Sequence, residues 1–131
     1  MIATFLSILL LQSFAFSDCS LICQINKTKV KLTKLEMKYI NDALTMYYAD
    51  CGVYPNIDQG LDALLKAPEK SKYSKECKNW GLYPYIKRIP KDPWGRPFIY
   101  ESNGSEFRLI SLGSDRREGG EGFKKDIVMN D

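Results

Sequence analysis

The feature that most constrains this 131-residue chain is one long stretch with helical periodicity and no helix breaker. Apolar residues recur at three- and four-residue steps through about residues 27–49, without Pro or Gly. The recurring residues are Leu32, Leu35, Tyr39, Ala43, Met46 and Tyr47. We expect this apolar side to face the protein, with Lys31, Lys34, Lys38 and Asp42 on the other side. Such a helix is about 35 Å long, and Gly52 after it suits a left-handed C-terminal cap.

The rest of the chain predicts short elements and turns. A second short helix is expected after Pro55, capped by Asp58 and ended by Pro68. Turn formers follow at residues 90–95, then a strand at 98–100, a two-residue Asn-Gly hairpin signal at 103–104 and a returning strand at 106–111. After Leu112 no helical or strand periodicity is visible. The fold class is therefore α+β, a long N-terminal helix packed on a small antiparallel sheet.

The N-terminal residues indicate export. Residues 1–17 are apolar without any charged side chain, and the stretch is shorter than the about 20 residues of a membrane span. They suit a secretory signal peptide cleaved before Asp18, which leaves one domain at residues 18–131 in the periplasm or outside the cell. The alternative is an anchor in the inner membrane made by residues 2–17. A lipoprotein at Cys19 is disfavoured because Asp18 stands where a lipobox needs a small residue.

Four cysteines in an exported chain predict disulfides, for which three connectivities exist. Cys23 and Cys51 lie at opposite ends of the predicted helix, too far apart for a bond. We therefore expect Cys51–Cys77 and Cys19–Cys23. A zinc site is disfavoured because the chain has no histidine and no C-x-x-C pair.

The composition excludes several functions. Without histidine, a Ser-His or Cys-His nucleophile cannot be built, and no paired-carboxylate or phosphate-loop pattern is present. The net charge of +3 is small, and basic residues alternate with acidic ones. We expect no enzyme activity, no nucleic-acid partner and, after cleavage of the signal peptide, no membrane contact.

The last loop is rich in oxygen ligands separated by glycines, at residues 111–115, 118–122 and 126–127. Calcium takes about six to eight oxygen ligands, and glycine allows backbone carbonyls to turn inward. The alternative is a solvated, flexible C-terminal tail.

The chain also resembles a known family, the major pseudopilin of type II secretion systems. Residues 85–95, YIKRIPKDPWG, are similar to the family segment "YIKRLPKDPWG", and residues 111–115 with 119–127 are similar to "SLGADG…GGEG…ADI". Upstream, Tyr54-Pro55 and Gln59-Gly60-Leu61 match the "YP…QGL" stretch, so the resemblance runs from about Leu35 to Ile127. It implies a pilin-like head that contacts other secretion subunits, or itself, without turnover.

The resemblance also implies a calcium site in the C-terminal loop. Asp115 and Asp126 look like its side-chain ligands, Leu112 like a main-chain ligand and Glu121 like a further ligand. Pro93, Trp94 and Gly95 form the expected structural anchor, with Trp94 in the core because a Trp between prolines usually anchors a turn.

Three departures from the family pattern qualify these expectations. Arg116 stands where the family has glycine, which is strained if the position needs a positive φ. Four basic residues, Arg116, Arg117, Lys124 and Lys125, balance four acidic ones in the loop, which should weaken calcium binding. The family's prepilin start is not matched at residues 1–17. We therefore expect either a start further upstream or a soluble exported binding module that uses the head without polymerising.

Overall fold

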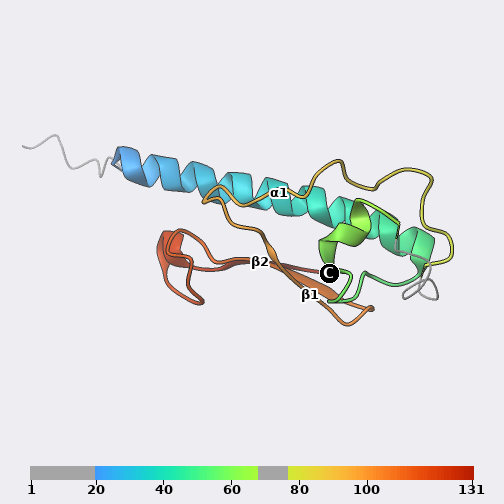
Figure 1. Cartoon of the computed structure of the whole chain (residues 1–131). Helices are drawn as coiled ribbons and strands as arrows, with labels where there is room; N and C mark the ends of the chain where they lie inside the picture. The colour runs from blue at the N-terminus through green and yellow to red at the C-terminus, as the bar shows by residue number, and fades with distance from the viewer. Residues whose placement is uncertain (1–19, 68–76) are drawn as a thin grey trace, which may run out of the picture.

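The computed structural model describes residues 20–67 and 77–131, and its main element is the helix α1, Leu21–Cys51 (Figure 1). The Ser20 hydroxyl caps its start by accepting a hydrogen bond from the Cys23 amide at 3.3 Å. Its end lies where the sequence predicts it, because Gly52 has a φ of 74° and donates its amide to the Tyr48 carbonyl. The helix begins at Leu21 instead of about Lys27, so it is longer than expected.

The side of α1 that faces the core is not the predicted one. Leu32, Leu35 and Met46 are exposed. The buried side chains of α1 are Thr33, Met37, Ile40, Ala43, Leu44 and Tyr47. Only Ala43 and Tyr47 of the predicted apolar set lie in the core. The helix therefore carries two apolar rows, and the sheet covers just one of them.

Three short antiparallel strands form the sheet, in the order β1-β2-β3. They are β1 Ile99–Ser102, β2 Phe107–Ser111 and β3 Ile127–Asn130. A four-residue loop joins β1 to β2, and the Asn103 side chain accepts the amides of Ser105 and Glu106. The expected two-residue turn is therefore wrong, although the hairpin is where it was predicted. The strand β3 was not expected at all.

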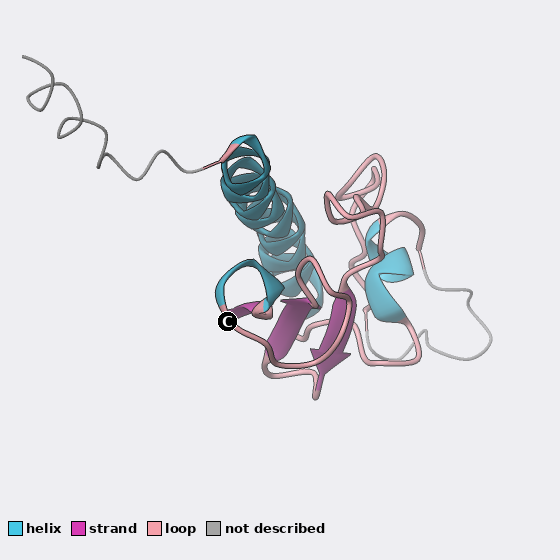
Figure 2. Ribbon diagram, turned by 90° about the vertical axis from the view of Figure 1, so that its left-hand side faces the viewer, coloured by secondary structure: helices cyan, strands magenta, loops and turns pink. Residues whose placement is uncertain are grey.

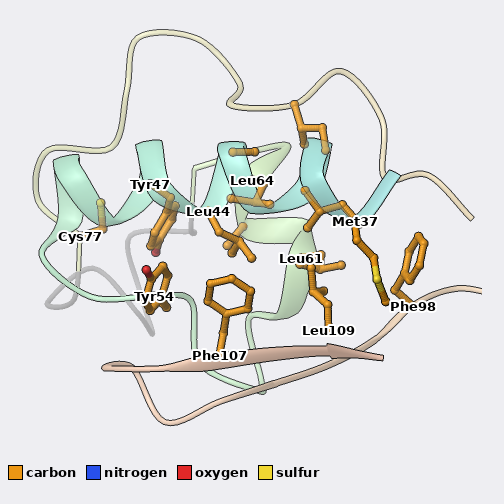
Figure 3. Packing of buried hydrophobic residues seen from close by; sticks show 14 residues of the cluster. Met37, Leu44, Tyr47, Tyr54, Leu61, Leu64, Cys77, Phe98, Phe107 and Leu109 are labelled. Atoms are coloured by element: carbon orange, nitrogen blue, oxygen red, sulfur yellow. The ribbon is translucent and has the colours of Figure 1, made fainter. Parts of the chain in front are cut away.

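The core lies between α1 and the sheet, with a short 3-10 helix, η1 Gly60–Leu64, at one side (Figure 2). Met37, Leu44 and Tyr47 point from α1 toward Phe107 and Leu109 of β2 (Figure 3). The turn before η1 is fixed by Asn56 and Gln59, whose side chains each accept the other's amide at 2.9 and 2.8 Å. The expected cap at Asp58 is therefore wrong. Together the elements confirm the α+β architecture.

Candidate functional site

The C-terminal loop, residues 112–126, joins β2 to β3 (Figure 1). Ser111 and Ile127 at its two ends pair directly across the sheet, so the loop starts and ends on the same rigid base. It contains a second 3-10 helix, η2 Gly122–Lys124. The loop is therefore closed on itself and is not an extended tail.

Main-chain carbonyls crowd together inside this loop. Gly113 has a φ of 67°, and a Cβ atom there would meet the carbonyl oxygens of Phe123, Lys124 and Lys125 at 2.8–3.1 Å. The Ser114 amide donates to the Phe123 oxygen at 3.0 Å and holds the two sides of the loop together. Glycine is required at position 113 because any side chain would collide with these oxygens. Several carbonyl dipoles thus concentrate negative potential in one small region.

Asp126 adds a carboxylate to the loop. Its Oδ2 atom accepts the Gly119 amide at 2.9 Å, whereas its Oδ1 atom is buried without a hydrogen-bond partner in the described part of the chain. Buried carboxylate oxygens normally have a partner. Asp126 also lines a cavity of about 420 Å³ together with Leu112, Glu118 and Gly119. An oxygen of this kind fits a hard cation.

The other predicted ligands lie in different surroundings. Asp115 accepts the Arg117 amide at 3.1 Å and does not line this cavity. Glu121 is exposed and immediately precedes η2. Within residues 20–67 and 77–131, no three acidic, Cys or His side chains come together as a metal cluster. The structure thus brings together Leu112 and Asp126, and a cation here would depend mainly on main-chain oxygens.

Arg116 connects the loop to the preceding turn. It has a φ of 62°, so the position does require the positive φ that the sequence suggested. Its guanidinium donates to the Trp94 carbonyl at 3.1 Å. The strain at this residue is therefore combined with a contact that glycine could not make.

The turn at residues 92–96 is anchored by Asp92, which the sequence reading missed. Asp92 is 5% exposed, and its Oδ1 accepts the amides of Trp94 and Arg96 at 3.1 and 2.8 Å. Its Oδ2 accepts the Ser111 hydroxyl at 2.8 Å, which ties the turn to the end of β2. The only sequence signal was the position of Asp92 within the turn-forming run at residues 90–95.

Trp94 is not in the core, contrary to the prediction. It is half-buried, and the Lys29 ammonium lies 5.9 Å from its ring centre. Pro93 is also half-buried, and Gly95 closes the turn with a φ of 84° and donates its amide hydrogen to the Asp92 carbonyl oxygen at 2.8 Å. The turn itself is therefore present, but the buried carboxylate holds it, and the indole does not.

A disulfide holds the opposite end of the molecule. Cys51 at the end of α1 is bonded to Cys77, the predicted pair, with their Cα atoms 4.5 Å apart. Nearby, the Tyr85 hydroxyl donates to Asp50 at 2.7 Å and accepts the Gly81 amide at 2.8 Å. Cys23 is also disulfide-bonded. Cys19 lies outside the described residues, and the Cys19–Cys23 pairing stays a prediction.

The predicted signal peptide, residues 1–17, also lies outside the described residues. Among the helices of the described part, none has the length and apolar character to cross a membrane.

Comparison with known proteins gives consistent matches. The sequence profile of the family described as "Type II secretion system (T2SS), protein G" matches residues 20–130. The type II secretion system core protein G of Pseudomonas aeruginosa is 41% identical over 104 residues, which cover 78% of this chain and 71% of that protein. The protein of the same name from Vibrio cholerae is 42% identical, over 78% of this chain and 70% of that protein.

A solved structure matches as well. The crystal structure of the major pseudopilin from the type 2 secretion system of enterohaemorrhagic Escherichia coli superposes with a TM-score of 0.68. The sequence identity is 29%, and the match covers 82% of this chain and 87% of that one.

Proposed function

The chain belongs to the protein G family of type II secretion systems, and from this premise we propose that it is a structural, non-enzymatic subunit whose C-terminal loop is ordered by calcium. The observation that carries the proposal is the family match over residues 20–130 together with the superposition on a major pseudopilin. The absence of histidine from the whole sequence supports a role without turnover. Its role would then be to contact other secretion subunits or further copies of the chain.

Calcium fits the chemistry of the loop. The buried Oδ1 atom of Asp126 would gain the partner that it otherwise lacks. Main-chain oxygens, Leu112 among them, would supply further neutral ligands, and Asp115 would contribute if it exchanged its bond to the Arg117 amide for the ion. Bound calcium would supply a positive charge that offsets the mutual repulsion of these oxygens. The loop's own balance of basic and acidic residues makes the proposed site a weak one.

Thermal unfolding tests the calcium site. With free calcium at about 100 times Kd, a folded-state site adds about 2.7 kcal/mol to the free energy of unfolding. We expect the melting temperature to rise with calcium and to fall with a chelator. Asp126→Asn should abolish the calcium effect, whereas Glu106→Gln, an exposed change in the β1–β2 loop, should keep it. Equal melting temperatures in calcium and chelator would show that the loop folds without the ion.

Export and partners need separate measurements. We propose that the protein acts in the periplasm or at the inner membrane. Intact-mass analysis of the protein in cell fractions distinguishes a chain that begins at Asp18 from one anchored by residues 2–17. Cross-linking in cells followed by identification of the linked proteins tests the subunit role. Linkage to secretion-apparatus subunits supports it, and a monomer free of such links would favour the soluble binding module.

A further inference from the structure

The uncovered apolar row of α1 lies on its N-terminal half. It consists of Leu21, Ile25, Leu32 and Leu35, which are 76%, 47%, 44% and 64% exposed. These positions fall on one line along the helix because they are separated by four, seven and three residues. In Figure 1 the sheet and the C-terminal loop lie below α1, and its first turns extend past the loop. The row ends at Tyr39, whose hydroxyl accepts the Lys87 amide at 3.4 Å.

A second row, of lysines, runs beside the apolar one. Lys31 and Lys34 immediately precede Leu32 and Leu35, so they are turned by about 100° around the helix from the apolar row, and Lys27 lies one turn before Lys31 on the same line. All three are exposed, and none forms an ion pair with another described residue. The neighbouring lysines differ, because Lys38 pairs with Asp42 at 3.0 Å and Lys29 lies over the Trp94 ring. Within the part of the chain that the structure describes, these three basic side chains therefore have no counter-charge.

We propose that the N-terminal half of α1 docks on the surface of a bilayer that contains anionic phospholipids. An exposed leucine row with lysines at its edge suits a helix that lies in the headgroup region. The apolar row would enter the boundary of the acyl chains, and the lysine stems would extend along it so that their ammonium groups meet lipid phosphates. The head, on another side of the helix, would stay in water. This inference departs from the expected lack of membrane contact and does not rest on the proposed function.

The charge pattern favours lipid over a second copy of the chain. From Ser20 to Asn41 the sequence holds five lysines and one acidic residue, the half-buried Glu36. If two copies paired through this row, their lysine rows would lie close together without acidic partners. Like charges in such positions are destabilising. An anionic bilayer supplies negative charge for the lysines and an apolar layer for the exposed apolar row.

Vesicle binding by the full chain tests the proposal. Residues 1–17 contain no lysine and no other charged side chain, so any insertion through them should not depend on Lys27, Lys31 and Lys34. We expect binding to phosphatidylglycerol–phosphatidylcholine vesicles to exceed binding to phosphatidylcholine alone and to weaken with salt. Changing Lys27, Lys31 and Lys34 together to Gln should lower the partition coefficient about 100-fold. The matched change at Lys66, Lys78 and Lys87, also exposed, should have little effect.

A depth probe locates the contact. Leu35→Trp should be quenched by brominated acyl chains, whereas Ile57→Trp, at an exposed site away from α1, should not. Leu32→Gln with Leu35→Gln should reduce binding while circular dichroism shows an unchanged fold. Vesicle binding that depends neither on lipid charge nor on the three lysines would overturn the proposal. So would self-association that the Leu32 and Leu35 changes abolish while vesicle binding persists, because a second copy would then cover this face.

Discussion

Arg116 holds a backbone conformation that glycine adopts more easily. Its φ of 62° makes it the single non-glycine residue with a positive φ in the described part of the chain. An L-residue in this region costs about 1–2 kcal/mol. The Trp94 carbonyl contact recovers only part of that cost because it is exposed to water. We expect Arg116→Gly to raise the free energy of unfolding by about 1 kcal/mol, as measured by urea denaturation.

Arg117→Gly is the matched control for this change. Arg117 is the next residue, is also exposed and has no positive φ, so glycine there should lower the free energy of unfolding by about 0.5–1 kcal/mol. If both variants lose stability alike, the guanidinium contact with Trp94 outweighs the backbone strain.

Some features of single residues could be predicted from the sequence, and others could not. The strain at Arg116 was foreseeable because a family pattern supplied the glycine. The network around Asp92 was not, since Ser111 lies 19 residues away and only the folded chain brings its hydroxyl to the carboxylate. Of the proposed ligands, Leu112 and Asp126 share a cavity, but the converging carbonyls leave no side-chain signature in a sequence. A cation site made of main-chain oxygens therefore cannot be predicted until the path of the loop is known.

At the scale of elements, the disulfide links the end of α1 to a distant part of the chain. It joins the last residue of α1 to Cys77, 26 positions later. Closing a loop of this length restricts the unfolded chain by about 3.5 kcal/mol in the chain-entropy estimate. We expect the double variant Cys51→Ser, Cys77→Ser to lose stability of that order in urea, with its helical circular dichroism retained under native conditions. An unchanged urea midpoint would mean that contacts such as Tyr85 to Asp50 suffice.

The elements differ in how far the sequence predicted them. The end of α1 was predictable because Gly52 is a local signal, and so was the position of the β1–β2 hairpin. Periodicity revealed apolar rows on α1 but not which row faces the sheet, because both rows have helical spacing. The strand β3 has four residues, too few for an alternation to stand out, and its pairing with β2 determines it. Local signals thus located the end of α1 and the β1–β2 hairpin, whereas tertiary contacts determine which helix face is buried and which strands pair.

At the scale of the whole molecule, three tyrosines join different parts of the fold. Burial raises the pKa of Tyr54, Tyr85 and Tyr100 to about 12, from an ordinary value of 10.0. The carboxylates of Asp131 and Asp50 contribute to the raised pKa of Tyr54 and Tyr85, after burial, in the same direction. Tyr100 donates its hydroxyl to the Pro55 carbonyl at 2.8 Å and so ties β1 to the segment before η1. These links exist only while the phenols are protonated.

The free energy of unfolding should therefore fall as the pH rises from about 10 to 12, in the interval between the ordinary and the raised pKa. Above pH 10 the unfolded chain releases phenol protons that the folded chain retains, so the unfolded state binds fewer protons and gains stability. Urea denaturation at several alkaline pH values measures the slope. Tyr100→Phe should lower the free energy of unfolding at neutral pH and make its fall with pH less steep. Tyr83→Phe, at a residue that is 80% exposed, should leave that slope unchanged. A slope insensitive to Tyr100→Phe would show that Tyr100 does not contribute to alkaline destabilisation and would leave Tyr54 and Tyr85 as its source.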